Sequence, residues 1–255
     1  MPSITLLTKA YSNSQLKKVG ESLHSALEGL EADVQLCGTT PRGWIQVSVS
    51  GKDENVAVNC LAEKIGVCQV DLDSVTRFLR AKGTVVNLKI SRNELHVDVG
   101  ISHPAIIDAT VSLQSLQAQM ADGKKITLAN LTELYGFCEN LPLTIMITSV
   151  DREKNRLDAE LSEKQQKQFN DWKTSLLDRL LIVGASVDEI TRALERAQSG
   201  RDVVDVEPLG MFEHAVVCKL GTDAAGLIPK IGRSLGRAAF SVFCPRRILR
   251  ALEKA

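Results

Sequence analysis

The sequence has 255 residues, of which 44% are hydrophobic and 24% charged, and its 31 basic residues balance its 31 acidic ones. This length fits one large domain or two to three small ones, and the composition is typical of a globular protein. No apolar run approaches the roughly 18 residues of a transmembrane helix, and the first residues lack the basic flank and cleavage site of a signal peptide. We therefore predict a cytoplasmic protein with no membrane partner.

Residues 1–80 predict a first domain with the element order β-α-β-β-α-β, which is the ferredoxin-like arrangement. Apolar residues at three- and four-residue spacing indicate two helices, and alternating apolar residues indicate strands. The expected strands cover residues 4–9, 33–37, 44–50 and 67–70, and the expected helices cover residues 16–30 and 56–65. A helical segment at residues 72–81 is expected to lead out of this domain.

Residues 81–167 predict a β-barrel of five strands with a helical pattern before the fourth strand, which is the order of an OB-fold. The expected strands cover residues 84–90, 95–101, 107–113, 143–150 and 156–161. The barrel resembles an S1 domain in four segments that occur in a fixed order, at residues 82–86, 95–100, 141–151 and 156–162. This resemblance implies a barrel that meets single-stranded nucleic acid through one sheet face and two loops.

The predicted barrel lacks the aromatic side chains that S1 domains display on their second and third strands. His96 stands at the usual aromatic position before Val97, and residues 106–111 contain no aromatic residue. Because stacking on an aromatic ring contributes about 1–3 kcal/mol per base, we expect the barrel by itself to bind RNA weakly. A barrel retained as a scaffold or protein-docking module is the open alternative.

Residues 168–255 predict a second ferredoxin-like domain, reached through a polar helix at residues 163–173. The expected strands cover residues 179–184, 203–207, 214–220 and 238–244, and the expected helices cover residues 186–197 and 227–235. The predicted fold class is therefore α+β, with a central five-stranded S1-like barrel flanked by two ferredoxin-like domains.

The whole chain resembles an uncharacterised archaeal family known as domain of unknown function 2110. The resemblance rests on four segments, at residues 42–47, 94–101, 134–136 and 140–143. It implies an archaeal cytosolic protein with a central S1-like domain, and it brings no known activity with it.

Cysteine and histidine positions offer no familiar metal or catalytic motif. The six cysteines form no C-x-x-C pair, and none of the four histidines lies at metal-ligand spacing from another histidine or a cysteine. We expect the thiols to be small buried side chains in a reducing compartment. The sequence therefore predicts no metal, no cofactor and no enzymatic activity.

The balanced net charge conceals a basic C-terminal end. From Gly226 onward seven basic residues stand against one acidic residue, so 7 − 1 gives +6 and residues 1–225 carry −6. Lys230, Arg233 and Arg237 recur at three- and four-residue spacing, which predicts one basic helix face. A local basic surface can bind a polyanion even when the whole chain is neutral. The candidate nucleic-acid-binding residues are Lys230, Arg233, Arg237, Arg246, Arg247, Arg250, His96, Lys124 and Lys125.

Two functions fit these patterns. The first is a non-enzymatic RNA-binding or ribosome-associated factor, in which the basic C-terminal end contacts the RNA backbone beside the barrel. The second is an adaptor that docks proteins within a translation or transcription complex and makes no direct RNA contact.

Overall fold

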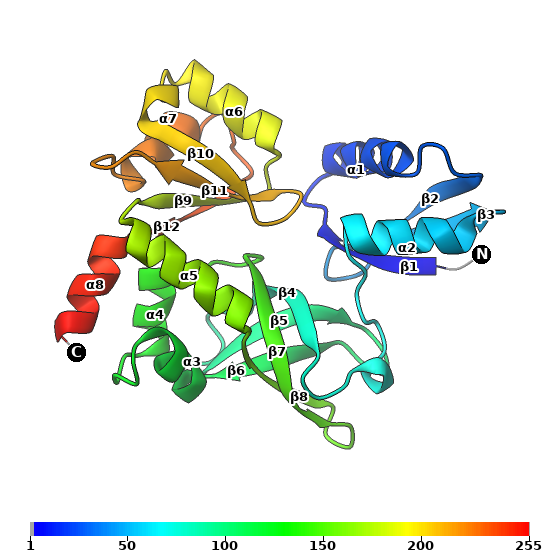
Figure 1. The fold of residues 1–255 in the computed structure, drawn as a ribbon, viewed down its shortest axis with the longest axis horizontal. Helices are drawn as coiled ribbons and strands as arrows, with labels where there is room; N and C mark the ends of the chain where they lie inside the picture. The colour runs from blue at the N-terminus through cyan, green and yellow to red at the C-terminus, as the bar shows by residue number, and fades with distance from the viewer. Residues whose placement is uncertain (1–2, 255) are drawn as a thin grey trace. The chain divides into compact units, whose positions relative to one another are not determined.

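The structure is a computed structural model that describes residues 3–254. The chain divides into two compact units (Figure 1). The first unit holds the described residues up to Val75 together with Val99–Ile107, and the second holds Thr76–Asp98 and the described residues from Asp108 onward. Each unit is described by itself below.

The first unit contains an antiparallel sheet with two helices. Its strands follow the order β1-β3-β2, and its elements are β1 Ser3–Lys9, α1 Asn13–Ala26, β2 Ala32–Thr39, β3 Trp44–Gly51 and α2 Glu54–Lys64. The predicted strand at 67–70 is reduced to one bridge between Val67 and Leu6, on the outer side of β1. The strand stops there because the carbonyl oxygen of Val70 instead accepts hydrogen bonds from the amides of Ser102 and His103, both at 3.0 Å.

The predicted helix at residues 72–81 is wrong, because only Leu72–Ser74 form a single 3₁₀ turn, η1. Val75 is already extended, with φ −81° and ψ 128°, and the chain then enters the barrel at Arg80. The side chain of Leu72 is buried, so burial rather than helical periodicity accounts for this apolar residue.

The second unit begins with a closed barrel in the order β4-β5-β6-β8-β7, which is the strand order of an OB-fold. Two helices, α3 Leu113–Met120 and α4 Leu128–Tyr135, lie between the third and fourth strands in the sequence. The strands are β4 Arg80–Val86, β5 Glu94–Ile101, β6 Ile107–Ser112, β7 Pro142–Asp151 and β8 Arg156–Leu161. The predicted five-stranded barrel is therefore confirmed, although its first strand begins at Arg80 rather than at residue 84.

Helix α5 Glu163–Ser175 leaves the barrel, as the polar pattern at 163–173 predicts, and a four-stranded antiparallel sheet follows it. The strand order β10-β11-β9-β12 matches the expected ferredoxin-like unit. Its elements are β9 Arg179–Val183, α6 Val187–Arg196, η2 Gly200–Asp202, β10 Val203–Pro208, β11 Glu213–Cys218, η3 Ala225–Leu227, α7 Ile228–Ile231, β12 Ala239–Phe243 and α8 Pro245–Lys254.

The helices of this second sheet are divided between its two faces (Figure 1). Residues of α6 and α7 pack on one face, where Leu180 and Ile182 of β9 point into their apolar core. On the other face Phe243 of β12 stacks against Phe169 of α5, with ring centroids 6.2 Å apart. Helix α8 packs against α5 and α4 on that same side.

An aromatic cluster joins the barrel to the second sheet. Tyr135, at the end of α4, packs edge to face against Phe169 and Phe243 at 5.6 and 5.8 Å, and its hydroxyl donates to the carbonyl oxygen of Met120 at 2.6 Å. Gly136 ends α4 in the left-handed conformation with φ +69°, and a Cβ atom there would lie 2.8 Å from the carbonyl oxygen of Val242. Glycine therefore allows α4 to end directly against β12.

Candidate functional site

Helix α8 separates apolar residues from basic residues. Its buried side includes Ile248 and Leu252, whereas Arg246, Arg250 and Lys254 are exposed. Because residues four apart lie above one another on an α-helix, these three cations share one face. Within residues 3–254 none of the three forms a salt bridge.

The loop between α3 and α4 adds basic residues beside this face. The ammonium of Lys124 donates to the carbonyl oxygen of Leu252 on α8. Lys125, Arg247 and Lys254 all line a shallow hollow of about 320 Å³ between the loop and α8. We call Lys125, Arg246, Arg247, Arg250 and Lys254 the α8 basic surface.

Only one residue of the α8 basic surface has an ion-pair partner among the described residues. Arg247 pairs with Glu133 of α4, and the two side chains are 55% and 68% exposed. An exposed pair of this kind is worth at most about 1 kcal/mol, so a stronger anion can displace the carboxylate.

The remaining predicted residues lie elsewhere. The expected basic helix face at 227–235 is not formed, because α7 ends at Ile231 and residues 232–237 form turns. Gly232 and Gly236 explain this early end, since glycine disfavours helix interiors. Lys230 pairs with Asp202 at 3.5 Å, while Arg233 and Arg237 are exposed. These three residues lie on the α6 and α7 side of the sheet. They are therefore separated in space from the α8 basic surface, although they are close to α8 in the sequence.

His96 lies on β5, opposite Val86 of β4, and is half-buried. Its neighbour Glu94 pairs with Arg156 at 3.3 Å, so this part of the barrel is not uniformly basic. The structure thus brings Lys124, Lys125 and the α8 arginines together, and it leaves His96 outside that group.

Phe78 is an exposed aromatic residue that the sequence does not indicate as a candidate. Phe78, just before β4, is 62% exposed and has a φ of +68°, which is uncommon for a bulky residue. The guanidinium of Arg77 lies 4.6 Å from the centroid of its ring. The expected helix at residues 72–81 gives Phe78 no special role. The sequence signal for an exposed aromatic residue is its position between Arg77 and Arg80, just before the barrel.

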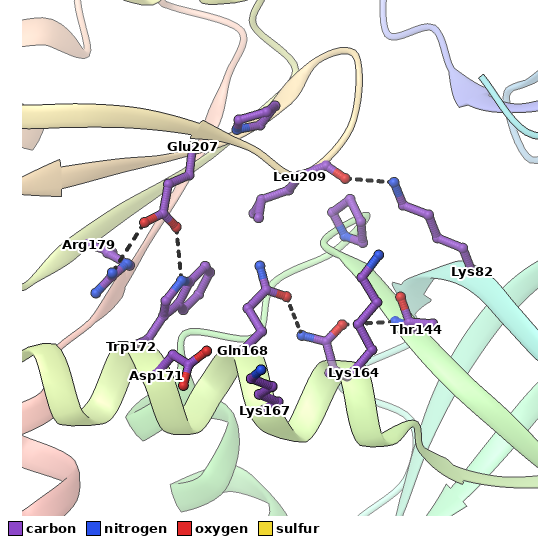
Figure 2. A pocket seen from close by; sticks show the side chains of 13 residues that line it. Lys82, Thr144, Lys164, Lys167, Gln168, Asp171, Trp172, Arg179, Glu207 and Leu209 are labelled. Carbon is purple, nitrogen blue, oxygen red and sulfur yellow. Dashed lines mark hydrogen bonds and ion pairs between the residues drawn. The ribbon is translucent and has the colours of Figure 1, made fainter. Parts of the chain in front are cut away.

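A pocket of about 580 Å³ opens between β4 and β7 of the barrel, helix α5 and the end of β10 (Figure 2). Its inner wall is a three-residue network. Glu207 accepts hydrogen bonds from Arg179 Nη2 at 3.2 Å and from Trp172 Nε1 at 2.9 Å, and the Arg179 guanidinium lies 5.0 Å from the Trp172 ring centroid. No sequence pattern indicates this pocket, because its residues come from five separate elements, β4, β7, α5, β9 and β10.

Thiol chemistry is not favoured at Cys218, which is buried, or at Cys138, which is partly buried. Burial raises the pKa of Cys138 to about 12 and that of Cys218 to about 11, and nearby carboxylates add to both shifts. Such thiols are almost entirely protonated at neutral pH and are weak nucleophiles. Among residues 3–254 no cluster of His, Cys, Asp or Glu has the arrangement of a metal site, and no helix is long and apolar enough to cross a membrane.

Three solved structures that resemble parts of this chain differ widely from it in sequence. The intact alpha subunit of aIF2 from Pyrococcus abyssi is 12% identical, with a TM-score of 0.27, over 66% of this chain and 96% of its own. A chain of the a/eIF2alpha-aDim2p-rRNA complex from Pyrococcus horikoshii is 14% identical, with a TM-score of 0.27, over 51% of this chain and 70% of its own. An uncharacterized protein from Methanocaldococcus jannaschii is 12% identical, with a TM-score of 0.24, over 35% of this chain and 96% of its own. Similarity at this level assigns no function.

Comparison with curated proteins gives no match. Comparison with protein families gives three matches that together span most of the chain. The DUF2110 N-terminal domain matches residues 3–69, the DUF2110 central domain matches residues 80–173 and the DUF2110 C-terminal domain matches residues 177–243. These matches confirm the resemblance found in the sequence motifs, and the chain belongs to the DUF2110 family.

Proposed function

We propose that this protein is a non-enzymatic RNA-binding factor whose α8 basic surface contacts the phosphate backbone. The observation that carries the proposal is the exposed face of α8, where Arg246, Arg250 and Lys254 lie in one row and form no ion pair with any other residue between 3 and 254. A row of cations along one helix face matches the repeating negative charge of a nucleic-acid strand.

The placement of these residues is unfavourable for the helix itself. Arg246 and Arg247 occupy the first turn of α8, which contains no acidic residue. The helix dipole favours anions at that end, and like charges four residues apart repel each other by a few tenths of a kcal/mol. A bound phosphate chain relieves both effects, so the arrangement suits a polyanionic ligand better than it suits an isolated helix.

Single-stranded RNA fits the rest of the second unit. OB barrels are a common fold for binding single strands, and the exposed ring of Phe78 offers a stacking surface on this one. Residues 1–225 carry −6, which disfavours nonspecific attachment of the whole surface to a polyanion. Contact is therefore expected to be local.

A matched pair of variants tests the proposal. One replaces Arg246, Arg250 and Lys254 with glutamine, and the other replaces Lys230, Arg233 and Arg237 with glutamine, so both lose three positive charges. Binding of fluorescent single-stranded RNA is measured by anisotropy across a salt series. If each of the five cations of the α8 basic surface neutralises one phosphate, log K falls with log salt at a slope of about −3.5. The α8 variant keeps two of the five, so its slope is expected to be shallower, at about −1.4.

The control triple variant is expected to keep the wild-type slope. Equal losses in both variants would mean that net charge alone governs binding, and no binding at low salt would refute the proposal outright. In the second case the adaptor hypothesis becomes the better one, and co-purification with ribosomal particles from native lysate tests it.

A further inference from the structure

We propose that the pocket between the barrel and the second sheet binds a phosphate monoester of nucleotide size through Lys82, Lys164 and Lys167. The pocket volume of about 580 Å³ lies within the range of about 300–1,000 Å³ that is common for small-ligand sites. This inference stands on residues separate from the α8 basic surface.

The charges that line the pocket do not cancel. Arg179 is neutralised by Glu207, which leaves Lys82, Lys164 and Lys167 against one remaining carboxylate, Asp171. Three positive charges minus one negative charge give +2. None of the three lysines forms a salt bridge among the described residues. The surplus of positive charge favours an anionic ligand with more than one negative charge, as in a phosphate monoester.

Lys82 is held in place by a neutral partner. Its ammonium donates to the carbonyl oxygen of Leu209 at 2.7 Å, across the mouth of the pocket (Figure 2). Although the residue as a whole is exposed, burial of its charged end lowers the pKa of Lys82, Glu213 opposes that shift and Lys164 adds to it. An anion placed between Lys82 and Lys164 would offset both the lost solvation and the repulsion.

Helix α5 presents its polar side to the pocket in a fixed conformation. The side chain of Gln165 accepts from the amide of Thr144 at 2.9 Å and donates to Gln168 Oε1 at 3.0 Å. This bond turns the amide nitrogen of Gln168 toward the turn that follows β10 (Figure 2). Lys164 and Lys167 precede Gln168 on the same helix and also line the pocket, so α5 contributes two cations and a neutral N–H donor.

The apolar part of the lining suits a nucleoside. Pro142, Pro208 and Leu209 contribute to the walls near the lysines, so a phosphate and an attached ring system can both be accommodated. The phosphate can come from a free mononucleotide or from the phosphorylated end of an RNA strand. Both sources present the same chemical group, and the experiment separates them.

Isothermal titration calorimetry of the full chain at low salt tests the inference with four ligands. They are adenosine monophosphate, adenosine, a 5′-phosphorylated octanucleotide and the same octanucleotide with a 5′-hydroxyl group. We expect each phosphorylated ligand that binds this pocket to bind at least about tenfold more tightly than its unphosphorylated counterpart. If the phosphate increases affinity only in the mononucleotide pair, the ligand of the pocket is a free mononucleotide. If it increases affinity only in the oligonucleotide pair, the ligand is the phosphorylated end of an RNA strand.

Four variants locate the binding. Lys164→Gln and Lys167→Gln are expected to weaken phosphate binding about tenfold each, whereas Lys89→Gln, an exposed lysine of the barrel outside the pocket, leaves it unchanged. The α8 triple variant is also expected to keep this binding, which distinguishes the pocket from the proposed RNA surface. Equal affinity of the phosphorylated and unphosphorylated members of both ligand pairs, or wild-type affinity in the Lys164→Gln and Lys167→Gln variants, would overturn the inference.

Discussion

Replacing Glu207 with glutamine is expected to destabilise the second unit by about 2–3 kcal/mol. The Glu207 carboxylate is the ion-pair partner of Arg179, whose side chain is only 5% exposed. Removing one partner of a buried ion pair typically costs about 3–5 kcal/mol, because the other charge remains buried and uncompensated. Glu207 itself is 31% exposed, so water replaces part of the lost interaction and the expected cost lies below that range.

The rest of the local network limits how far Arg179 can adjust. Its Nη1 donates to Ser175 Oγ at 3.0 Å and to the carbonyl oxygen of Leu177 at 3.1 Å, while its Nε has no hydrogen-bond partner among the residues that the structure describes. Trp172 also loses the charged acceptor of its indole N–H. Arg179 is therefore held beside the altered residue rather than released to solvent.

Urea unfolding, followed by circular dichroism and tryptophan fluorescence, measures this cost. The double variant Arg179→Met, Glu207→Gln is the control, because it removes the buried charge together with its partner and is expected to be more stable than Glu207→Gln alone. A single variant within about 0.5 kcal/mol of the wild type, or a double variant less stable than the single one, would refute the reasoning.

Two further predictions concern the same unit. Burial lowers the pKa of His214 below its usual 6.5, opposed by a hydrogen bond with the backbone of Ala185, so the unfolded chain binds the proton more readily. Stability is therefore fully present above pH 6.5 and falls as the pH drops through the lowered pKa, by at most about 1.4 kcal/mol per pH unit, and His214→Gln is expected to flatten urea midpoints measured between pH 5 and 7. Gly136→Ala is expected to lower the melting temperature more than Gly123→Ala, since both glycines have positive φ but a Cβ atom at Gly123 meets no atom within 4 Å, whereas one at Gly136 approaches Val242. Equal losses in the two alanine variants would show that backbone conformation alone sets the cost, at about 1–2 kcal/mol.

The sequence predicts the elements of this protein better than their ends. Alternation and helical spacing identify the five barrel strands and the four strands of the second sheet, because burial of one face imposes those periods. The errors occur where a local period competes with another interaction. In residues 72–81 the apolar side chains of Leu72 and Val75 are buried without a continuous helix. In residues 227–235 the helix ends before Gly232.

The candidate sites follow a different rule. Four of the five residues of the α8 basic surface lie within one helix, so a helical pattern after Pro245 is enough to indicate that Arg246 and Arg250 share a face. Its joining with Lys125 depends on how the α3–α4 loop meets α8, which no periodic pattern encodes. The pocket around Lys82 and Lys164 depends even more on tertiary packing, since its lining comes from the barrel, α5 and β10.

Helix α5 links the two proposed sites. Its apolar side carries Phe169 and Trp172 into the aromatic cluster and packs against α8, while its polar side presents Lys164 and Lys167 to the pocket. A weakened Glu207 network would therefore loosen the wall that supports Trp172, and with it the helix that presents the lysines. Glu207→Gln also raises the net charge of the pocket lining from +2 to +3, which by itself favours an anion, so weaker phosphate-monoester binding by this variant would show that loss of the network outweighs the added charge. The salt slope of RNA binding by the α8 basic surface is expected to stay unchanged.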